Sequence, residues 1–165
     1  MSNMRFFFLL SVALGFLEGL FFYSLLPDRM AIHFNASGRA DGWGSKHQFF
    51  IFYGIIVVVM SLLFWGLPLV IRLVPESLIN LPNKGYWLAP ERKKQTLDRL
   101  SDQMLFTGCM ALLLMDGILF LVIKANLSAI PALPTEWMWG LIVVFIAANV
   151  AWTISLIRSF RRPKE

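Results

Sequence analysis

Residues 26–47 hold the densest group of side chains in this chain that could do chemistry. Both histidines, His33 and His47, lie here together with Asn35 and Asp41. Imidazole nitrogens and carboxylate or amide oxygens are the donors that divalent metals use in proteins. Their spacing matches no standard zinc pattern, and no activated nucleophile stands beside His33. We therefore predict no catalytic residue, no metal and no cofactor, while a metal held by this segment stays open as an alternative.

Two further interpretations of the segment stay open. In one it is a compact, hydrogen-bonded cap, in which Asn35 or Asp41 accepts from backbone N–H groups, glycines allow tight turns, and Phe34 and Trp43 pack against the protein. In the other it recognises a peptide or envelope ligand. The candidate ligand-binding residues are His33, Asn35, Gly38, Asp41, Trp43 and Lys46.

Four long apolar runs must position these residues. Each is about 20 residues or more, enough for a helix to cross the roughly 30 Å hydrocarbon core of a bilayer. No Ala-x-Ala-like cleavage site follows the first run, so we interpret it as a retained span. The predicted fold is all-α: a polytopic, single four-helix membrane domain over residues 1–165. Its predicted transmembrane helices are residues 6–26, 49–74, 104–123 and 137–157.

Lysine and arginine are distributed unevenly between the two sides of these spans. The side with both termini and the connection 75–103 carries 11 of them, whereas the side with the loop 27–48 carries 4. Because basic residues accumulate in the cytoplasm, we predict cytoplasmic termini and an outward-facing loop. Cationic ends also suit anionic lipid headgroups. The predicted partner is thus the lipid bilayer, with no nucleic acid.

Two acids lie inside the predicted spans. Glu18 and Asp116 share nearly the same depth, roughly 10–12 Å below the outer end at about 1.5 Å per residue. A carboxylate facing lipid is costly, so both should point into the bundle or a wet cavity. Glu18 also borders a stripe of small residues, Ser11, Gly15 and Gly19, where another helix can approach closely.

Two roles for these acids stay open. They form either a cation or proton site, or a protonated pair that hydrogen-bonds between helices. Asn149 is a third polar residue within the spans, near the middle of the last one. We expect it to lie in the same interior polar layer and to form an interhelical hydrogen bond.

A second motif occupies residues 80–92, on the cytoplasmic side. Pro82 and Pro90 prevent one continuous helix, and Tyr86 and Trp87 are suited to a membrane interface. A polar helix should begin at 91–94 and continue into the third span. The motif is either a structured elbow or a site for a lipid phosphate or a cytoplasmic protein partner. Its candidate residues are Asn80, Pro82, Asn83, Lys84, Tyr86, Trp87, Pro90, Glu91 and Arg92.

The two motifs together resemble the signature of a known family. The matching residues are Leu26-Pro27, His33-Phe34-Asn35, Gly38, Asp41, Trp43, Ser45-Lys46 and the block 80–92. They resemble a bacterial membrane family of unknown function whose domain also occurs in SdpI-type immunity proteins, which are longer and carry further spans. The resemblance covers about the first 100 residues. It implies a multi-pass protein of the bacterial cytoplasmic (inner) membrane, and toxin immunity and repressor recruitment are the roles of the SdpI-type proteins that it resembles.

Three classes of function fit these features. We predict a non-enzymatic sensor or immunity-like protein that recognises a peptide or envelope ligand through its outer loop, because this class uses both motifs and needs no catalytic group. One alternative is a small ion-coupled transporter that uses Glu18 and Asp116, for which four short spans would have to form a homo-oligomer. The other alternative is a metal-dependent membrane enzyme that uses the His33 loop.

Overall fold

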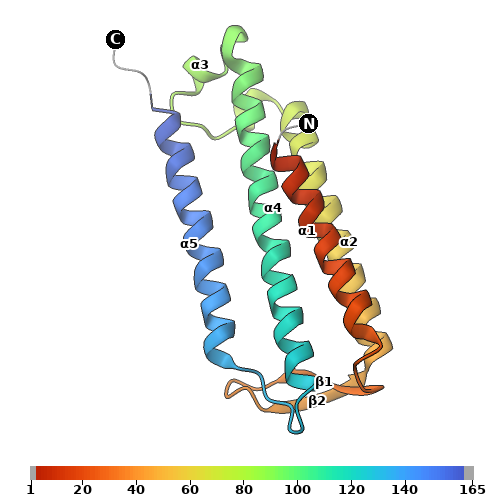
Figure 1. The fold of residues 1–165 in the computed structure, drawn as a ribbon. Coiled ribbons are helices and arrows are strands. Elements are labelled where there is room, and N and C mark those ends of the chain that lie inside the picture. Colours follow the sequence, from red (N-terminus) through yellow and green to blue (C-terminus); the bar gives the residue numbers. More distant parts are fainter. Residues whose placement is uncertain (1–2, 162–165) are drawn as a thin grey trace.

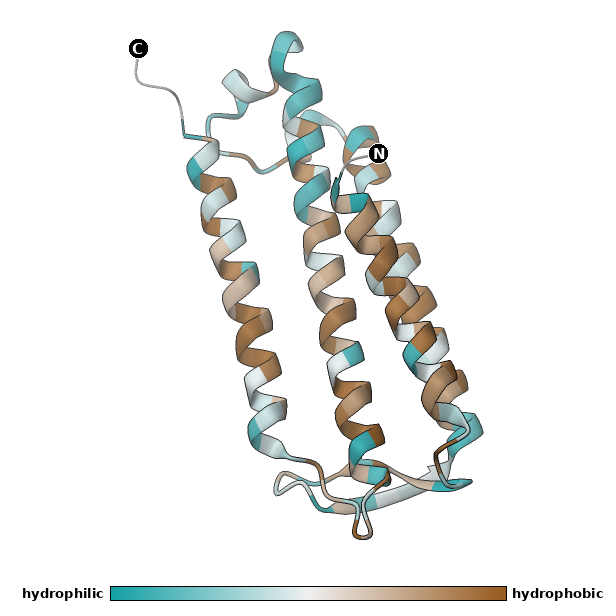
Figure 2. Cartoon of the chain, in the orientation of Figure 1, coloured by the Kyte–Doolittle hydropathy of each residue, from teal (hydrophilic) through white to brown (hydrophobic). Residues whose placement is uncertain are grey.

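Four long helices run side by side in the computed structural model, which describes residues 3–161 (Figure 1). Each is long and apolar enough to cross a membrane, and their middle parts are predominantly hydrophobic (Figure 2). The chain is thus a multi-pass membrane protein with the four predicted spans. The helices are α1 (Asn3–Tyr23), α2 (Lys46–Leu73), α4 (Pro90–Asn126) and α5 (Thr135–Ser159).

The helix ends differ from the predicted ones by a few residues, except at the start of α4. This helix begins at Pro90, so most of residues 90–103 extend the third span as the expected polar helix. Proline suits the first helical position because it lacks the N–H that the first turn leaves unpaired. The first span has the predicted length of 21 residues but lies three residues earlier in the chain. It ends at Tyr23, and Leu26 turns inward into the core before the next element starts.

The outer segment, predicted as a compact loop, contains two strands, which the all-α prediction did not include. Strands β1 (Arg29–Phe34) and β2 (Ala40–Ser45) form an antiparallel hairpin, which lies across one end of the helices (Figure 1). We call this end of the bundle the hairpin end. The glycines in 38–44 have a low propensity for strands, so the sequence did not indicate β2. In the structure the side chains of His33 and Ile32 lie over Gly42 and Gly44, where a Cβ would collide with them.

One asparagine fixes the hairpin to the bundle. Asn126, the last residue of α4, accepts a hydrogen bond from the Ala31 N–H (2.7 Å) and donates one to the Ala31 carbonyl (2.9 Å). Its amide also donates to the Val122 carbonyl one turn earlier, at 2.9 Å. Met30, beside Ala31, is fully buried in the core. The strand is therefore held by its backbone on one side and by an apolar side chain on the other.

The turn of the hairpin is tied to the connection between α4 and α5. The Leu133 N–H donates to the Gly38 carbonyl at 2.8 Å, and Arg39 and Ala132 form an isolated β-bridge. Gly38 has a φ of +79°, and a Cβ at this position would collide with the Leu133 carbonyl. Only glycine satisfies both the left-handed backbone and the close approach.

The helix α4 is the centre of the bundle. It packs against α1, α2 and α5, whereas α5 packs against α4 and no other described helix. At Gly108 the helices approach so closely that a Cβ would lie 2.5 Å from the Phe64 Cβ and 2.8 Å from the Phe8 ring. In a membrane the hydrophobic effect does not drive helices together, so they associate by close packing at small residues. The core therefore lies between α1, α2 and α4.

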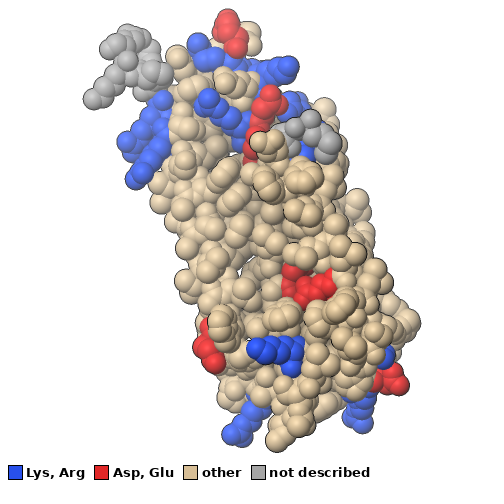
Figure 3. Space-filling view, viewed as in Figure 1, with Lys and Arg blue, Asp and Glu red and all other residues tan. Residues whose placement is uncertain are grey.

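Opposite the hairpin end, residues 74–89 form an elbow that contains the 3₁₀ turn η1 (Glu76–Leu78) and the short helix α3 (Lys84–Trp87). We call this end of the bundle the elbow end. It has its own small core of Ile79, Leu81, Leu88, Leu97 and Phe160. Basic side chains crowd this end (Figure 3). Arg162 and Lys164, which belong to the same basic set in the sequence, lie outside the described residues.

Loss of the Asn126 side chain should loosen the hairpin. In an Asn126→Ala variant the Ala31 backbone loses both partners, and the amide hydrogens of β1 should exchange with deuterium about tenfold faster or more, since a buried hydrogen bond is worth about 1 kcal/mol or more. The matched control is Asn149→Ala, because Asn149 donates only within its own helix. Equal exchange of β1 in both variants, measured by mass spectrometry, would contradict the clamp.

Candidate functional site

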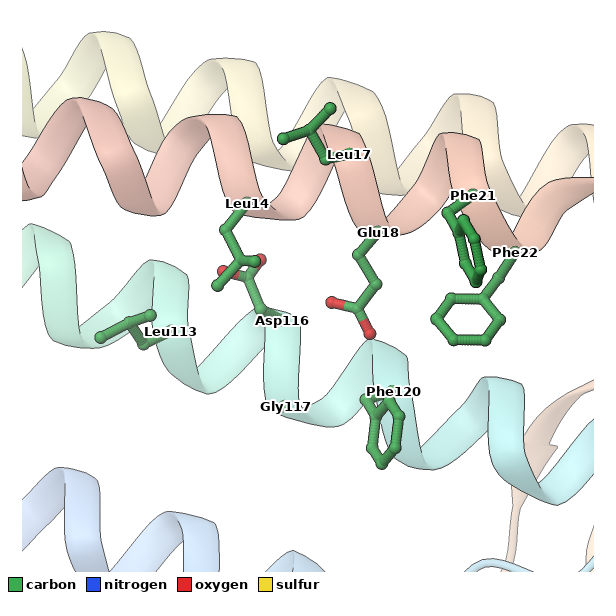
Figure 4. A pocket seen from close by; sticks show the side chains of 9 residues that line it. All are labelled: Leu14, Leu17, Glu18, Phe21, Phe22, Leu113, Asp116, Gly117 and Phe120. Atoms are coloured by element: carbon green, nitrogen blue, oxygen red, sulfur yellow. The ribbon is translucent and has the colours of Figure 1, made fainter.

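A groove between α1 and α4 brings the two intramembrane acids together. Glu18 projects from α1 towards α4 and Asp116 from α4 towards α1 (Figure 4). The groove is a cavity of about 680 Å³. Its walls are otherwise apolar, formed by Leu14, Leu17, Phe21, Phe22, Leu113, Gly117 and Phe120. The sequence predicted that Glu18 and Asp116 lie at the same depth in the membrane, and in the structure both line this groove.

Asp116 joins three helices at this level. It is 4% exposed, and its Oδ1 accepts a hydrogen bond of 2.9 Å from the Tyr53 hydroxyl of α2. From α1, Gly15 lies against the pair: a Cβ there would be 2.6 Å from Asp116 Oδ1 and 3.0 Å from Tyr53 Oη. Ser11 and Gly19 of the same stripe are buried as well. The small-residue stripe therefore makes room for a polar contact between the other two helices.

The carboxyl groups are only partly satisfied. Asp116 Oδ2 and Glu18 Oε1 are buried and have no hydrogen-bond partner among residues 3–161. Buried polar atoms are nearly always paired, and a buried charge without a partner is strongly unfavourable. The two residues that line the groove on opposite helices thus each carry a carboxyl oxygen without a hydrogen-bond partner.

The groove is open on the outer side of the bundle. Glu18 is half-buried and exposed apolar side chains surround it, Leu17 (62%) and Phe21 (68%) among them. In the space-filling view acidic atoms appear within the broad uncharged band that covers the middle of the bundle (Figure 3). Asp116 thus lies inside the bundle, whereas Glu18 lies at the edge of a lateral opening.

The prediction for Asn149 is wrong in its geometry. Its side-chain amide donates to the Phe145 carbonyl of its own helix, at 2.9 Å, and not to another helix. Asn149 also lies away from the groove that the two acids share. The reason is that α5 packs only against α4, so it never reaches the face on which Glu18 and Asp116 meet.

At the hairpin end, His33 and Asp41 form an exposed pair. His33 Nδ1 lies 2.5 Å from Asp41 Oδ1, with 71% and 44% of the two side chains exposed. The strand register slips around His33, which places it opposite Gly42. A Cβ on Gly42 would lie 2.7 Å from the His33 Cβ, so the missing side chain makes room for the imidazole. The hairpin thus presents this pair to the surroundings.

The other predicted residues of the outer segment serve the hairpin itself. Asn35 Oδ1 accepts hydrogen bonds from the Ser37 and Arg39 N–H groups, and so closes the turn. Lys46 donates to the Leu26 carbonyl at 3.0 Å and lies 3.1 Å from Asp28.

The two aromatic residues of the segment behave differently from each other. Phe34 packs against the core as expected. Trp43 does not, because it is 46% exposed. It lies on the same strand as Asp41, so an apolar surface accompanies the exposed polar pair.

The second motif builds a clasp around the end of α5. The side chains of Asn83 and Trp87 both donate to the Phe160 carbonyl, at 3.2 and 2.7 Å. The last carbonyls of a helix have no partner within the helix, and this clasp satisfies one of them. Asn83 adopts a left-handed backbone, with a φ of 53°. Asparagine tolerates that conformation better than most residues.

The remaining residues of the motif have separate places on the elbow. The Arg92 guanidinium lies over the Tyr86 ring and donates to the Tyr86 carbonyl, whereas Lys84 donates to the carbonyls of Glu76 and Ser77. Pro90 begins α4. The exposed residues among the motif's candidates are Asn80, Pro82, Asn83, Pro90 and Glu91. The polar groups of Asn83, Lys84 and Arg92 are thus already in use within the elbow.

Among residues 3–161, no group of three or more histidine, cysteine, aspartate or glutamate side chains is placed to hold a metal ion. His33 and Asp41 supply two such donors. Glu18 and Asp116 form the second pair, on α1 and α4.

The comparisons with known proteins cover the first part of this arrangement. Residues 10–57 match the family described as "Domain of unknown function (DUF1648)". The match runs from α1 through the hairpin into α2, and so includes Glu18, Tyr53 and the His33–Asp41 pair. Asp116 and the elbow lie beyond it. No curated protein and no solved structure matches the chain.

Sequence reasoning missed two residues of this geometry, Tyr53 and Asn126. Each carries a signal that could have found it. Tyr53 is a hydroxyl within an otherwise apolar stretch of the second span, and Asn126 is a polar residue just past the predicted end of the third. Polar groups at such positions seek partners on neighbouring elements.

Removal of the Tyr53 hydroxyl should destabilise the bundle. In Tyr53→Phe the buried Asp116 carboxyl loses its hydrogen-bond donor, and the free energy of unfolding should fall by about 1–3 kcal/mol. Unfolding in detergent, followed by circular dichroism, measures the change.

Tyr23→Phe is the matched control, because no hydrogen bond of that hydroxyl is present in the described structure. A Tyr53→Phe protein as stable as this control would show that the contact with Asp116 contributes nothing.

Proposed function

We propose that this chain is a non-enzymatic sensor or immunity-like protein of the bacterial cytoplasmic membrane, which binds a peptide or envelope ligand through its hairpin. The observation that carries the proposal is the exposed His33–Asp41 pair on a hairpin that is fixed to the bundle. A donor–acceptor pair on a rigid support can bind a polar ligand at little cost in ordering. Trp43 supplies an exposed aromatic surface on the same strand as Asp41.

The distribution of charge supports an outward-facing hairpin. Eleven of the lysines and arginines belong to the elbow end and the termini, and four belong to the hairpin end. Basic residues near the ends of spans favour the cytoplasm. On this orientation the His33–Asp41 pair faces the outside, and the elbow faces the cytoplasm, where a protein partner could reach it.

The resemblance to SdpI-type proteins supports the immunity-like class by analogy. The resemblance lies in the hairpin and elbow motifs, and the hairpin is also within the matched family of unknown function. Fold and motif analogy say less about function than a site does. An ion-coupled transporter that uses Glu18 and Asp116, and a metal-dependent enzyme that uses the His33 loop, therefore stay open as alternatives.

The orientation can be tested by cysteine labelling. In a background in which Cys109, the single cysteine, is replaced by Ala, Ser45→Cys should react with a membrane-impermeant maleimide in intact cells. Ser159→Cys should react only after the membrane is permeabilised. Both serines are exposed in the structure, so accessibility within the protein does not distinguish them. The opposite labelling pattern would reverse the orientation.

The ligand-binding role can be tested by growth. In a deletion strain challenged with a panel of envelope-active peptides, His33→Ala and Asp41→Asn should fail to restore tolerance although the protein reaches the membrane in normal amount. His33→Ala removes the imidazole of the pair and Asp41→Asn removes the negative charge, and neither change touches the Asn126 clamp.

Gln48→Ala is the control for this experiment, as an exposed residue at the start of α2 outside the proposed surface. Full tolerance with His33→Ala and Asp41→Asn would refute the role of the pair. A fall in protein amount that parallels the loss of tolerance would assign the pair to folding instead.

A further inference from the structure

We propose that the groove between α1 and α4 binds a small lipophilic amine that enters from the bilayer, with its ammonium group between Glu18 and Asp116. This site is separate from the hairpin surface, and it does not depend on the function proposed above. It rests on the cavity, its two unpaired carboxyl oxygens and its otherwise apolar walls.

The carboxyl oxygens define the polar part of the ligand. Asp116 is only 4% exposed. Its Oδ1 accepts a hydrogen bond from Tyr53, whereas its Oδ2 has no hydrogen-bond partner. Glu18 Oε1 is the second unpaired acceptor, on the opposite wall. An ammonium group carries positive charge and up to three N–H donors, so one group can serve both oxygens. A ligand without a donor would leave them unsatisfied.

The walls define the rest of the ligand. Phe21, Phe22 and Phe120 line the groove beside leucines of both helices. Aromatic faces attract organic cations and also pack against alkyl or aryl groups. A bare metal ion would require several more oxygen ligands than this groove offers. Charge and apolar surface together therefore fit an organic cation with a hydrophobic body.

The size and the depth of the groove indicate how such a ligand arrives. Its volume of about 680 Å³ lies in the range of roughly 300–1,000 Å³ typical of small-molecule sites. Asp116 precedes the end of α4 by ten residues, which corresponds to about 15 Å of helix. A lipid headgroup amine at the membrane surface would have to descend that distance. A small amine that dissolves in the bilayer reaches the lateral opening directly.

The binding test uses the full-length protein in phosphatidylcholine nanodiscs with 4-phenylbutylamine as the probe. Calorimetry, corrected for empty nanodiscs, should show saturable binding. The neutral isostere 4-phenylbutan-1-ol should bind at least roughly tenfold more weakly, because a hydrogen bond from a charged donor is stronger than one from a hydroxyl. Equal binding of the alcohol would overturn the proposal, as would the absence of saturable binding by the amine.

Variants locate the site. The double variant Glu18→Gln with Asp116→Asn should lose at least roughly tenfold in amine affinity for the same reason. Glu136→Gln should bind normally, because Glu136 is an acid at the exposed start of α5, outside the groove. Unchanged affinity in a folded double variant would overturn the site.

A second pair of variants keeps both acids and so covers the case in which the double variant does not fold. Leu17→Trp fills the groove and should block binding, whereas Leu20→Trp, on the same helix and 75% exposed but outside the groove, should not. Equal binding by both tryptophan variants would refute the location. Saturable binding of the peptide acetyl-Phe-Lys-Leu-amide without binding of the free amine would replace the small amine by a lysine side chain, and would likewise overturn the proposal.

Discussion

The hydrogen bond from Tyr53 to Asp116 is the contact around which the bundle is arranged. A carboxyl group within a membrane span is costly when it faces hydrocarbon, so neighbouring helices must supply hydrogen-bond partners or a polar cavity. Here α2 supplies the donor, and α1 supplies a glycine that permits the approach. The three helices that form the main core therefore meet at one polar point. Because a single donor cannot satisfy both carboxyl oxygens, the same contact leaves an acceptor facing the groove.

The two ends of the domain are fixed by polar clamps of the same kind. At the hairpin end the Asn126 side chain pairs with both backbone groups of Ala31. At the elbow end Asn83 and Trp87 converge on the Phe160 carbonyl. In each case a side chain near a turn satisfies backbone groups that regular structure leaves open. The two motifs thus contain residues that build these ends and residues whose polar groups stay exposed, among them the His33–Asp41 pair.

The sequence predicted the four spans and the elbow because apolar runs and prolines act locally. It also predicted that Glu18 and Asp116 share a level, since helical rise converts residue number into depth. It failed for the hairpin, where glycines with low strand propensity are accepted because His33 and Ile32 pass over them. The predicted interhelical hydrogen bond of Asn149 was wrong because the position of α5 depends on packing between helices, and hydropathy carries no information about that packing. Tyr53 and Asn126 acquire their roles from partners distant along the chain, at Asp116 and Ala31.

The attachment of α5 to α4 alone has a consequence for the order in which the domain is completed. Every buried residue of the main core, from Phe8 to Ile123, precedes α5 in the chain. The Asn126 clamp also precedes it. A nascent chain that has inserted α4 therefore already contains its whole principal core, and α5 adds to a finished surface. The carbonyl at Phe160 reaches Asn83 and Trp87 only after α5 has been added. Closure of the elbow thus comes later than formation of the core along the direction of synthesis.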